Sequence, residues 1–142
     1  MTGPEMISLA RQNIEAFNAA DWQRAKATLA PDAVYDEVGT QQRIEGADRV
    51  VEAFQAWKRA MPDAKGTITK AVSGDSTVTL EITWNGTHTG PLQGPTGTIP
   101  ASGKRQETRA AMVFTFQGDR IKESHQYFDL MTLLRQIGAL PQ

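Results

Sequence analysis

The chain has 142 residues, the size of one ordinary domain, so we expect a single domain over residues 1–142. Its 15 basic and 16 acidic side chains give a net charge of -1, so no overall field favours nucleic acid or an anionic membrane as a partner. The lack of cysteine excludes disulfides, thiolate nucleophiles and iron–sulfur clusters, and two histidines do not favour a structural zinc site.

The N-terminal residues 1–6 contain no cationic run followed by an apolar stretch, so they do not have the pattern of a secretory signal. No segment of the sequence approaches the roughly 18 consecutive apolar residues that a membrane span requires. We therefore expect a soluble, cytoplasmic protein.

Apolar residues at the spacing of one helix face predict a first helix over residues 4–20, with a stripe formed by Ile7, Ala10, Ile14 and Phe17. The Asp21 carboxylate can accept the free amides at the start of a second, short helix. This second helix should end before Pro31, and one face of it would be formed by Trp22, Ala25 and Leu29.

Residues 33–38 have the composition of a strand, and residues 39–46 have that of a polar turn. A third helix is predicted over residues 47–60, with an apolar stripe formed by Val50, Phe54, Trp57 and Met61. Asp48 lies in its first turn, where the helix dipole favours an anion, and Pro62 follows its end.

From residue 66 onward the apolar period changes from about 3.6 to 2, which predicts a sheet. We expect strands at residues 66–73, 77–88, 104–117 and 120–128, and a hairpin turn at 117–120. A final helix should end at Gly138, a left-handed cap residue, with a stripe formed by Leu130, Leu133, Leu134 and Ile137.

Helices in the first half and antiparallel strands in the second predict an α+β fold, with helices on one face of a curved sheet. Between two of the strands, residues 90–103 are rich in glycine and proline, which occupy seven of fourteen positions. This segment can be a lid over a cavity mouth or a long connector, and the sequence leaves both interpretations open.

Common catalytic motifs do not match this sequence. Gly103 and Lys104 are followed by Arg105 rather than by Ser or Thr, so the segment lacks the pattern of a phosphate-binding loop. Ser73 lacks the preceding glycine of a nucleophile elbow. His88 and His125 are far apart in the chain, so a metal site would need distant parts of the fold, and we expect no metal.

Several runs of the sequence resemble known families. The first half is similar to nuclear transport factor 2-like proteins in the runs Phe17–Trp22 and Leu29–Tyr35 and in Gly46. The second half resembles the SnoaL-like polyketide cyclase (ester cyclase) family in the runs Trp84–Gly94, Gly118–Ile121 and Phe128–Gly138. The resemblance covers nearly the whole chain and indicates a single SnoaL-like domain.

The resemblance implies a cone-shaped α+β barrel (cystatin-like or nuclear transport factor 2-like). Three helices would pack on a curved, mostly antiparallel sheet, with an apolar pocket at the wide end and sheet faces that pair into a homodimer. It also implies metal-free, cofactor-free chemistry on a hydrophobic small molecule. One conflict arises at Asn85-Gly86, which has the composition of a hairpin turn, whereas the family implies one long strand. We expect the strand.

The cyclases of this family close a ring by intramolecular aldol condensation, using an Asp and a His on adjacent strands of the last hairpin. An ungapped match of residues 118–121 and 134–138 places this Asp at Gln126 and this His at Met112. An amide has no useful basicity and a thioether cannot carry the proton, so the usual pair is replaced. The Asn that some cyclases have in the first strand falls at Tyr35.

Three other residues are candidates for acid–base chemistry. His88 and His125 come first because only imidazole titrates near neutral pH unaided, although His88 can instead hydrogen-bond the glycine-rich segment. Strand alternation places His125 and Gln126 on opposite faces, so His125 should point out of the cone unless a bulge intervenes. Asp129 can take part in catalysis or simply cap the final helix.

A pocket in a cone-shaped fold must be lined by residues that otherwise resemble core, and we expect these to be among Phe17, Tyr35, Trp57, Met112, Phe114 and Gln126. Two functions remain open. One is a cyclase- or isomerase-type enzyme that needs no cofactor and acts on a hydrophobic small molecule. The other is a non-catalytic ligand-binding or dimerisation module of the same fold.

Overall fold

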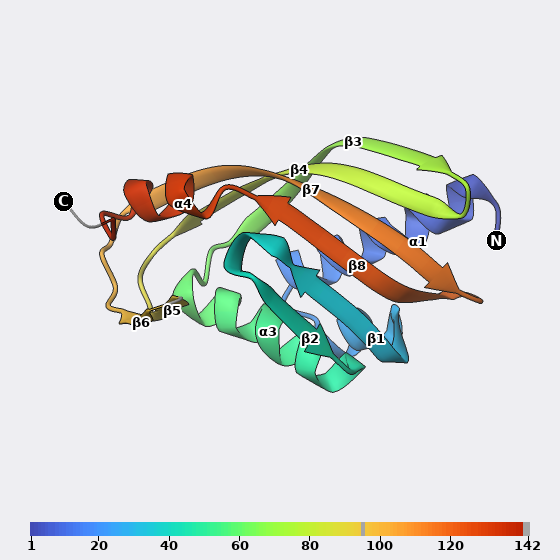
Figure 1. Cartoon of the computed structure of the whole chain (residues 1–142), viewed down its shortest axis with the longest axis horizontal. Coiled ribbons are helices and arrows are strands. Elements are labelled where there is room, and N and C mark those ends of the chain that lie inside the picture. The colour runs from blue at the N-terminus through green and yellow to red at the C-terminus, as the bar shows by residue number, and fades with distance from the viewer. Residues whose placement is uncertain (95, 141–142) are drawn as a thin grey trace.

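The structure is a computed structural model that describes residues 1–94 and 96–140 (Figure 1). Its α-helices are α1 (Gly3–Asn18), α2 (Trp22–Ala27), α3 (Ala47–Ala60) and α4 (Leu130–Gln136). Side chains cap three of them: Thr2 accepts the Glu5 amide at the start of α1, Asp21 accepts the Arg24 amide at the start of α2, and Asp129 accepts the Met131 amide at the start of α4. The bounds of α3 are those predicted from its apolar stripe.

One sheet has the strand order β2-β1-β8-β7-β4-β3. Its strands are β1 (Leu29–Glu37), β2 (Gln42–Glu45), β3 (Lys65–Gly74), β4 (Thr77–Thr87), β7 (Arg105–Gln117) and β8 (Arg120–Phe128). Strands β1 and β8 are parallel, and the other neighbouring pairs are antiparallel. This mostly antiparallel, curved sheet with its helices confirms the predicted cone-shaped α+β fold (Figure 1).

The core lies between the helices and the inner face of the sheet. Strand alternation directs every second side chain of β1, β4, β7 and β8 towards α1 and α3. The largest buried side chains of this layer include Ile14, Phe17, Val50, Phe54, Tyr35, Leu80, Ile82, Met112 and Phe114. Burial of these apolar surfaces stabilises the cone and fixes which side chains face its interior.

The prediction for residues 29–31 was wrong. Leu29 and Pro31 belong to β1 rather than to the end of the second helix. The strand starts early because the Ile121 amide of β8 donates to Thr28 O (2.7 Å) and Leu29 pairs with Ile121. Pro31 has no amide to donate, and it lies where the pairing of β1 with β8 is irregular, between Leu29 and Val34.

The prediction of a turn over residues 39–46 was also wrong in part. A short 3-10 helix, η1 (Val38–Thr40), turns the chain, and β2 then returns antiparallel to β1. The exposed Arg43 and Glu45 gave this segment a polar composition, because an edge strand carries charged side chains towards solvent. Ile44, opposite Tyr35, is its half-buried apolar side chain.

Asn85 and Gly86 lie inside β4, so the long strand implied by the family resemblance is confirmed. Gly86 is there for space rather than for a turn. A Cβ atom on Gly86 would lie 3.1 Å from both Cβ and Sδ of Met61, closer than most real contacts. The strand can therefore pass directly beside Met61 at the edge of the core.

The glycine- and proline-rich segment contains a small separate hairpin of β5 (Leu92–Gly94) and β6 (Gly97–Ile99). The Gly90 amide donates to Ala60 O (3.0 Å), and Leu92 is buried, so the segment is attached to the end of α3. Within residues 1–94 and 96–140, no helix is long and apolar enough to cross a membrane.

Candidate functional site

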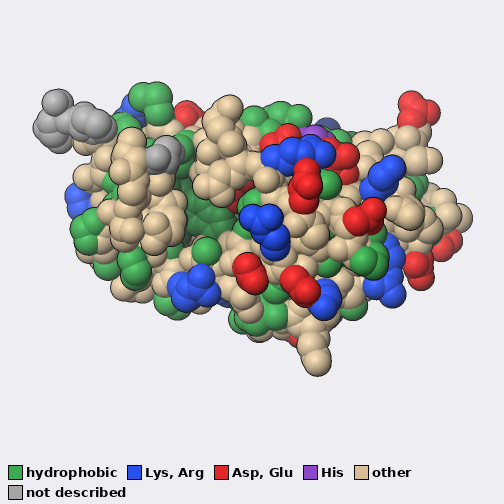
Figure 2. Space-filling view, turned by 60° about the horizontal axis from the view of Figure 1, so that its bottom comes forward, with side chains coloured by type: hydrophobic (Ala, Val, Ile, Leu, Met, Phe, Trp, Pro, Cys, Tyr) green, Lys and Arg blue, Asp and Glu red, His purple; other side chains and the backbone are tan. Residues whose placement is uncertain are grey.

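A cavity of about 70 Å³ lies between α1, α3 and the inner faces of β4, β7 and β8. A single water molecule needs about 10–15 Å³ by this measure, so the cavity has room for several groups of that size. In Figure 2 a hollow with hydrophobic side chains at its floor separates the end that carries the β5–β6 hairpin from the rest of the molecule. The cavity is lined by Asn13, Ile14, Phe17, Tyr35, Phe54, Trp57, Met61, Ala64, Trp84, Gln106, Thr108, Met112, Gln126, Phe128 and Leu133.

Six aromatic rings dominate this lining and hold one another in place. Phe17 meets Trp84 edge-to-face with ring centroids 5.2 Å apart. Tyr35 meets Phe54 in the same way at 5.5 Å, and the ring centroids of Trp57 and Phe128 are 6.3 Å apart. Because such contacts fix the ring orientations, the cavity presents an ordered apolar surface to anything that enters it.

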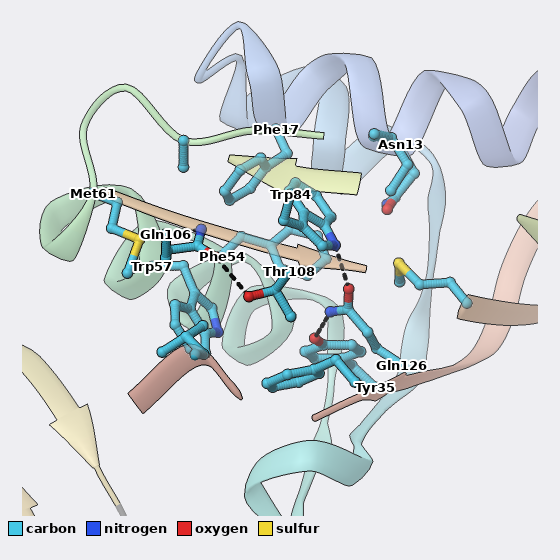
Figure 3. A pocket seen from close by; sticks show the side chains of 15 residues that line it. Asn13, Phe17, Tyr35, Phe54, Trp57, Met61, Trp84, Gln106, Thr108 and Gln126 are labelled. Atoms are coloured by element: carbon cyan, nitrogen blue, oxygen red, sulfur yellow. Dashed lines mark hydrogen bonds between the residues drawn. The ribbon is translucent and has the colours of Figure 1, made fainter. Parts of the chain in front are cut away.

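A chain of hydrogen bonds crosses the cavity wall (Figure 3). The Trp84 indole N–H donates to Gln126 Oε1 (2.7 Å), and Gln126 Nε2 donates to Tyr35 Oη (2.6 Å). The Tyr35 hydroxyl in turn donates to Glu37 Oε2 (2.8 Å). An indole N–H can only donate, so it fixes the orientation of the Gln126 amide and the direction of the whole chain, which ends on the carboxylate.

Glu37 is a buried carboxylate at the end of this chain, and only 3% of it is exposed. Its Oε2 also accepts the Trp57 indole N–H (2.9 Å), and its Oε1 accepts the Thr40 hydroxyl (2.7 Å). None of the ion pairs among residues 1–94 and 96–140 includes Glu37. Neutral donors alone therefore compensate for its burial, an arrangement that is costly and is more typical of functional sites than of cores.

The phenol of Tyr35 is held in its protonated form. Burial, and after it the negative charge and the hydrogen bond of Glu37, raise the pKa of Tyr35 well above its ordinary value. The hydroxyl therefore acts as a donor to Glu37, while its oxygen accepts from Gln126.

Gln106 and Thr108 form a second polar group in the cavity lining, and neither side chain carries a charge. The Thr108 hydroxyl donates to Gln106 Oε1 (2.6 Å), and both residues are buried on β7. The only acceptor of Gln106 Nε2 among the described residues is Met61 Sδ, at 3.6 Å. A thioether is a weak acceptor, so this amide N–H retains the capacity to donate to a ligand oxygen.

Five of the six residues expected in the pocket line this cavity, namely Phe17, Tyr35, Trp57, Met112 and Gln126. Phe114 lies elsewhere in the core, fully buried and outside the cavity lining. Met112 and Gln126 are directly opposite each other on β7 and β8. The structure thus brings together the two positions at which the family resemblance places its acid–base pair, and both carry uncharged side chains here.

His88 lies outside the cavity, at the base of the segment that carries the β5–β6 hairpin. Its Nδ1 accepts the Ser102 amide (3.2 Å), and the backbone of His88 pairs with Gly103 and Lys104. Its Nε2 is buried and has no hydrogen-bond partner among the described residues. Burial lowers the pKa of His88, which favours the neutral ring, so His88 here closes the loop between β4 and β7.

His125 is on the outer face of the sheet, opposite in direction to Gln126. Its Nδ1 is 3.0 Å from Asp36 Oδ2 on β1, and its Nε2 is 3.1 Å from Glu123 Oε1 on β8. The ring also stacks on Tyr127. His125 therefore belongs to a cluster of charges on the outer face, not to the cavity.

Asp129 is exposed and caps α4, accepting hydrogen bonds from Thr132 and Met131. The bonds from the Thr132 hydroxyl and amide lower the pKa of Asp129 below its usual range. The structure therefore does not bring His88, His125 and Asp129 to the cavity or to one another.

Several polar residues of the site were not predicted from the sequence, and Glu37 is the most important of them. A usable signal existed for it, because Tyr35 was expected to face inward and strand alternation places residue 37 on the same face. Trp84, Gln106 and Thr108 follow from the same period along β4 and β7. Their hydrogen bonds, in contrast, depend on contacts between strands that no sequence period specifies.

The chain matches the family model of SnoaL-like polyketide cyclases over residues 7–137, and it belongs to this family. A SnoaL-like polyketide cyclase structure from Jannaschia sp. CCS1 is 16% identical, with a TM-score of 0.86, covering 98% of this chain and 95% of that one. TsrD from Streptomyces laurentii is 23% identical, with a TM-score of 0.84 and 99% of each chain covered.

A protein of ketosteroid isomerase-like fold from Catenulispora acidiphila, solved with trimethylamine, is 20% identical, with a TM-score of 0.79. The match covers 99% of this chain and 96% of that one. At these identities the likeness shows the fold, which is that of the ketosteroid isomerase-like and nuclear transport factor 2-like proteins. No curated protein matches the sequence at a significant level.

Proposed function

We propose that this member of the SnoaL-like family binds a neutral, hydrophobic small molecule in the cavity between α1, α3 and the sheet. The observation that carries the proposal is the lining itself, in which six ordered aromatic rings surround a small number of buried amides and hydroxyls. Ligand sites in proteins typically combine a mostly apolar surface with a few polar groups that orient the ligand.

The charge and the polar groups of the site narrow the ligand class. Glu37 lies behind Tyr35 and Trp57 without a cation partner among the described residues, so an anionic ligand in the cavity would be repelled. The Gln106 amide, bonded only to a thioether in the described structure, supports a ligand with an oxygen that accepts a hydrogen bond. A hydrophobic ketone or ester has both properties.

The usual aldol pair plays no part in this proposal. Met112 and Gln126 occupy its positions, and Gln126 is engaged with Trp84 and Tyr35. Such a ligand site fits an enzyme of this family or, as the alternative, a non-catalytic binding module of the same fold, which is supported because neither His88 nor His125 lines the cavity. The enzyme and the binding module both require the ligand to occupy the cavity.

Filling the cavity should weaken ligand binding. We expect 2-tetralone, a neutral bicyclic ketone, to change the tryptophan fluorescence of the chain, since Trp57 and Trp84 line the cavity. Ala64→Phe places a ring in the cavity and should weaken this binding at least about tenfold, the equivalent of ~1.4 kcal/mol. Fluorescence titration of both proteins measures the change.

Ala27→Phe is the matched control, because Ala27 is exposed at the end of α2 and its substitution should leave the affinity unchanged. The anion 2-naphthoate has a similar ring system and should bind more weakly than 2-tetralone. Equal affinity of 2-tetralone for the wild type and for a folded Ala64→Phe variant would show that the ligand site lies elsewhere.

We further propose that the chain forms a homodimer through the outer face of the sheet. Val72 on β3 and Tyr127 on β8 are 49% and 48% exposed on this face, and Val113 lies between them on β7. A second copy is the occupant we propose, because the same mixture of apolar residues and charge pairs can complement itself about a twofold axis.

Light scattering at micromolar concentration should therefore give about twice the chain mass of 15.5 kDa. Val113→Glu should lower the mass towards that of the monomer, because a charge at the centre of an apolar contact is costly to bury. Met131→Glu changes an exposed side chain on α4 and should leave the dimer intact. A wild-type mass of 15.5 kDa would contradict the proposal.

A further inference from the structure

Ligand binding alone does not explain why Glu37 is buried beside the cavity. A carboxylate with 3% exposure and no ion pair among the described residues does not serve stability, because apolar side chains would fill its place at lower cost. Its position is nevertheless specified by three donors from three elements, Tyr35 on β1, Thr40 in η1 and Trp57 on α3. Two of these donors, Tyr35 and Trp57, line the cavity.

We propose that Tyr35 and Glu37 form a proton-accepting pair for a carbon acid bound in the cavity, with Tyr35 in contact with the ligand and Glu37 as the final acceptor. The inference rests on the proposed ligand site and assigns it a reaction class, the reversible deprotonation of a carbon next to a carbonyl group. Tyr35 is then the catalytic residue, and Glu37 acts through it.

The direction of the hydrogen-bond chain is what makes this pair suitable. Gln126 donates to Tyr35 Oη, so the tyrosine cannot direct its own proton towards Gln126 and must direct it to Glu37. The phenolic proton therefore points to Glu37, and the phenolic oxygen keeps a lone pair that can accept a proton from the ligand. The Glu37 carboxylate is the last group of the chain. In the described structure its side chain accepts hydrogen bonds from Tyr35, Thr40 and Trp57 and donates none.

The proposed step balances in atoms and charge. The C–H bond of the ligand breaks, its electron pair remains on the ligand as an enolate, and the proton bonds to Tyr35 Oη. In the same step the original phenolic O–H bond breaks, and that proton bonds to Glu37 Oε2. The carboxylate becomes a carboxylic acid, the ligand carries the negative charge, and the reverse transfer restores both.

Tyr35 alone is not a sufficient base. Burial and the Glu37 charge raise its pKa, so a tyrosinate is not available near neutral pH. Proton acceptance by the phenol must therefore be coupled to proton loss towards Glu37. Asp36, the next carboxylate on β1, faces the opposite side of the sheet and bonds to His125, so it cannot replace Glu37.

Hydrogen–deuterium exchange at carbon tests this pair directly. In D₂O the wild type should accelerate deuterium uptake at the carbon between the ring and the carbonyl of 2-tetralone, measured by NMR. Glu37→Gln keeps the shape of the side chain but cannot accept the proton, and it should lower the protein-dependent rate by about 10² to 10⁴-fold. Tyr35→Phe should have an effect of the same order, and it keeps the ring contact with Phe54.

A purely structural role of Glu37 is separated from this one by the binding affinity, which such a role would alter together with the exchange rate. The affinity for 2-tetralone, followed by tryptophan fluorescence, should change little in Glu37→Gln, because Glu37 does not line the cavity. Asp36→Asn, on the same strand, is the matched control and should exchange at the wild-type rate.

The outcomes distinguish the two proposals. Binding of 2-tetralone without accelerated exchange in the wild type, or exchange that both Glu37→Gln and Tyr35→Phe retain, would overturn the proton-accepting pair and leave the ligand site intact. Failure of the wild type to bind 2-tetralone would contradict the ligand site itself. If Glu37→Gln does not fold, Tyr35→Phe decides the question, because it removes the hydroxyl that donates to Glu37 from the cavity lining.

Discussion

Phe114→Ala should lower the free energy of unfolding by about 3–5 kcal/mol, a large part of the total stability of a domain of this size. Phe114 is fully buried on the inner face of β7, with 0% of its surface exposed, and it is not among the residues that line the cavity of the site. Truncation of a fully buried ring leaves a void in the core, so the transfer term and the cavity term both count. Urea denaturation measures the change.

Phe54→Ala provides the matched comparison, since Phe54 is the same residue type and is 7% exposed, but lines the existing cavity. A ring that borders empty space makes fewer contacts on that side, so its removal should cost clearly less. Equal losses for the two variants would mean that the cavity is packed in solution. They would therefore also count against the ligand site.

The wild type should not catalyse the metal-free aldol ring closure that is typical of the family's cyclases. An anthracycline-type methyl ester should be closed about 10² to 10⁴-fold more slowly than by a cyclase with the Asp and His in place. The physical reason is that Met112 and Gln126 cannot exchange protons with the reacting atoms. Product formation followed by chromatography measures the rate.

Met112→His combined with Gln126→Asp should introduce closure activity, because the two positions are directly opposite on β7 and β8. Each single substitution should remain inactive and serves as the control. His88→Ala and His125→Ala should leave any residual rate unchanged, since neither histidine lines the cavity. Wild-type turnover comparable to that of a complete cyclase would refute the assignment of these two positions.

Ring closure and deprotonation need different proton-carrying groups. The Tyr35–Glu37 pair would form an enolate, but closure also requires a proton for the oxygen of the attacked carbonyl, and Met112 has none to give. The wild type is therefore expected to exchange carbon-bound protons of a suitable ketone without closing a ring.

The sequence by itself determined the order and type of most elements. Apolar periods placed α1, α3 and the long strands β3, β4, β7 and β8, and they are strongest in β4 and β7, where one face is buried along most of the length. Alternation also predicted the outward direction of His125 from the inward direction of Gln126. Local patterns succeed where burial is continuous along an element.

The start of β1 and the edge strand β2 were decided only by the tertiary structure. Leu29 and Pro31 are local signals for a helix end, yet pairing with Ile121 of β8 draws this segment into the sheet. Residues 42–45 are polar because an edge strand has little to bury. Their sequence therefore has no apolar period that would predict their pairing with β1.

The site depended on the tertiary structure even more strongly. The sequence indicated that Tyr35 and Gln126 face the interior, but they are far apart in the chain and meet only because β1 lies parallel to β8. That pairing, together with α3, assembles donors around Glu37 and turns one glutamate of an ordinary polar run into a buried carboxylate beside a cavity. Periodicity determines which face a side chain takes, whereas only contacts between distant strands and helices determine its hydrogen-bond partners and therefore its chemistry.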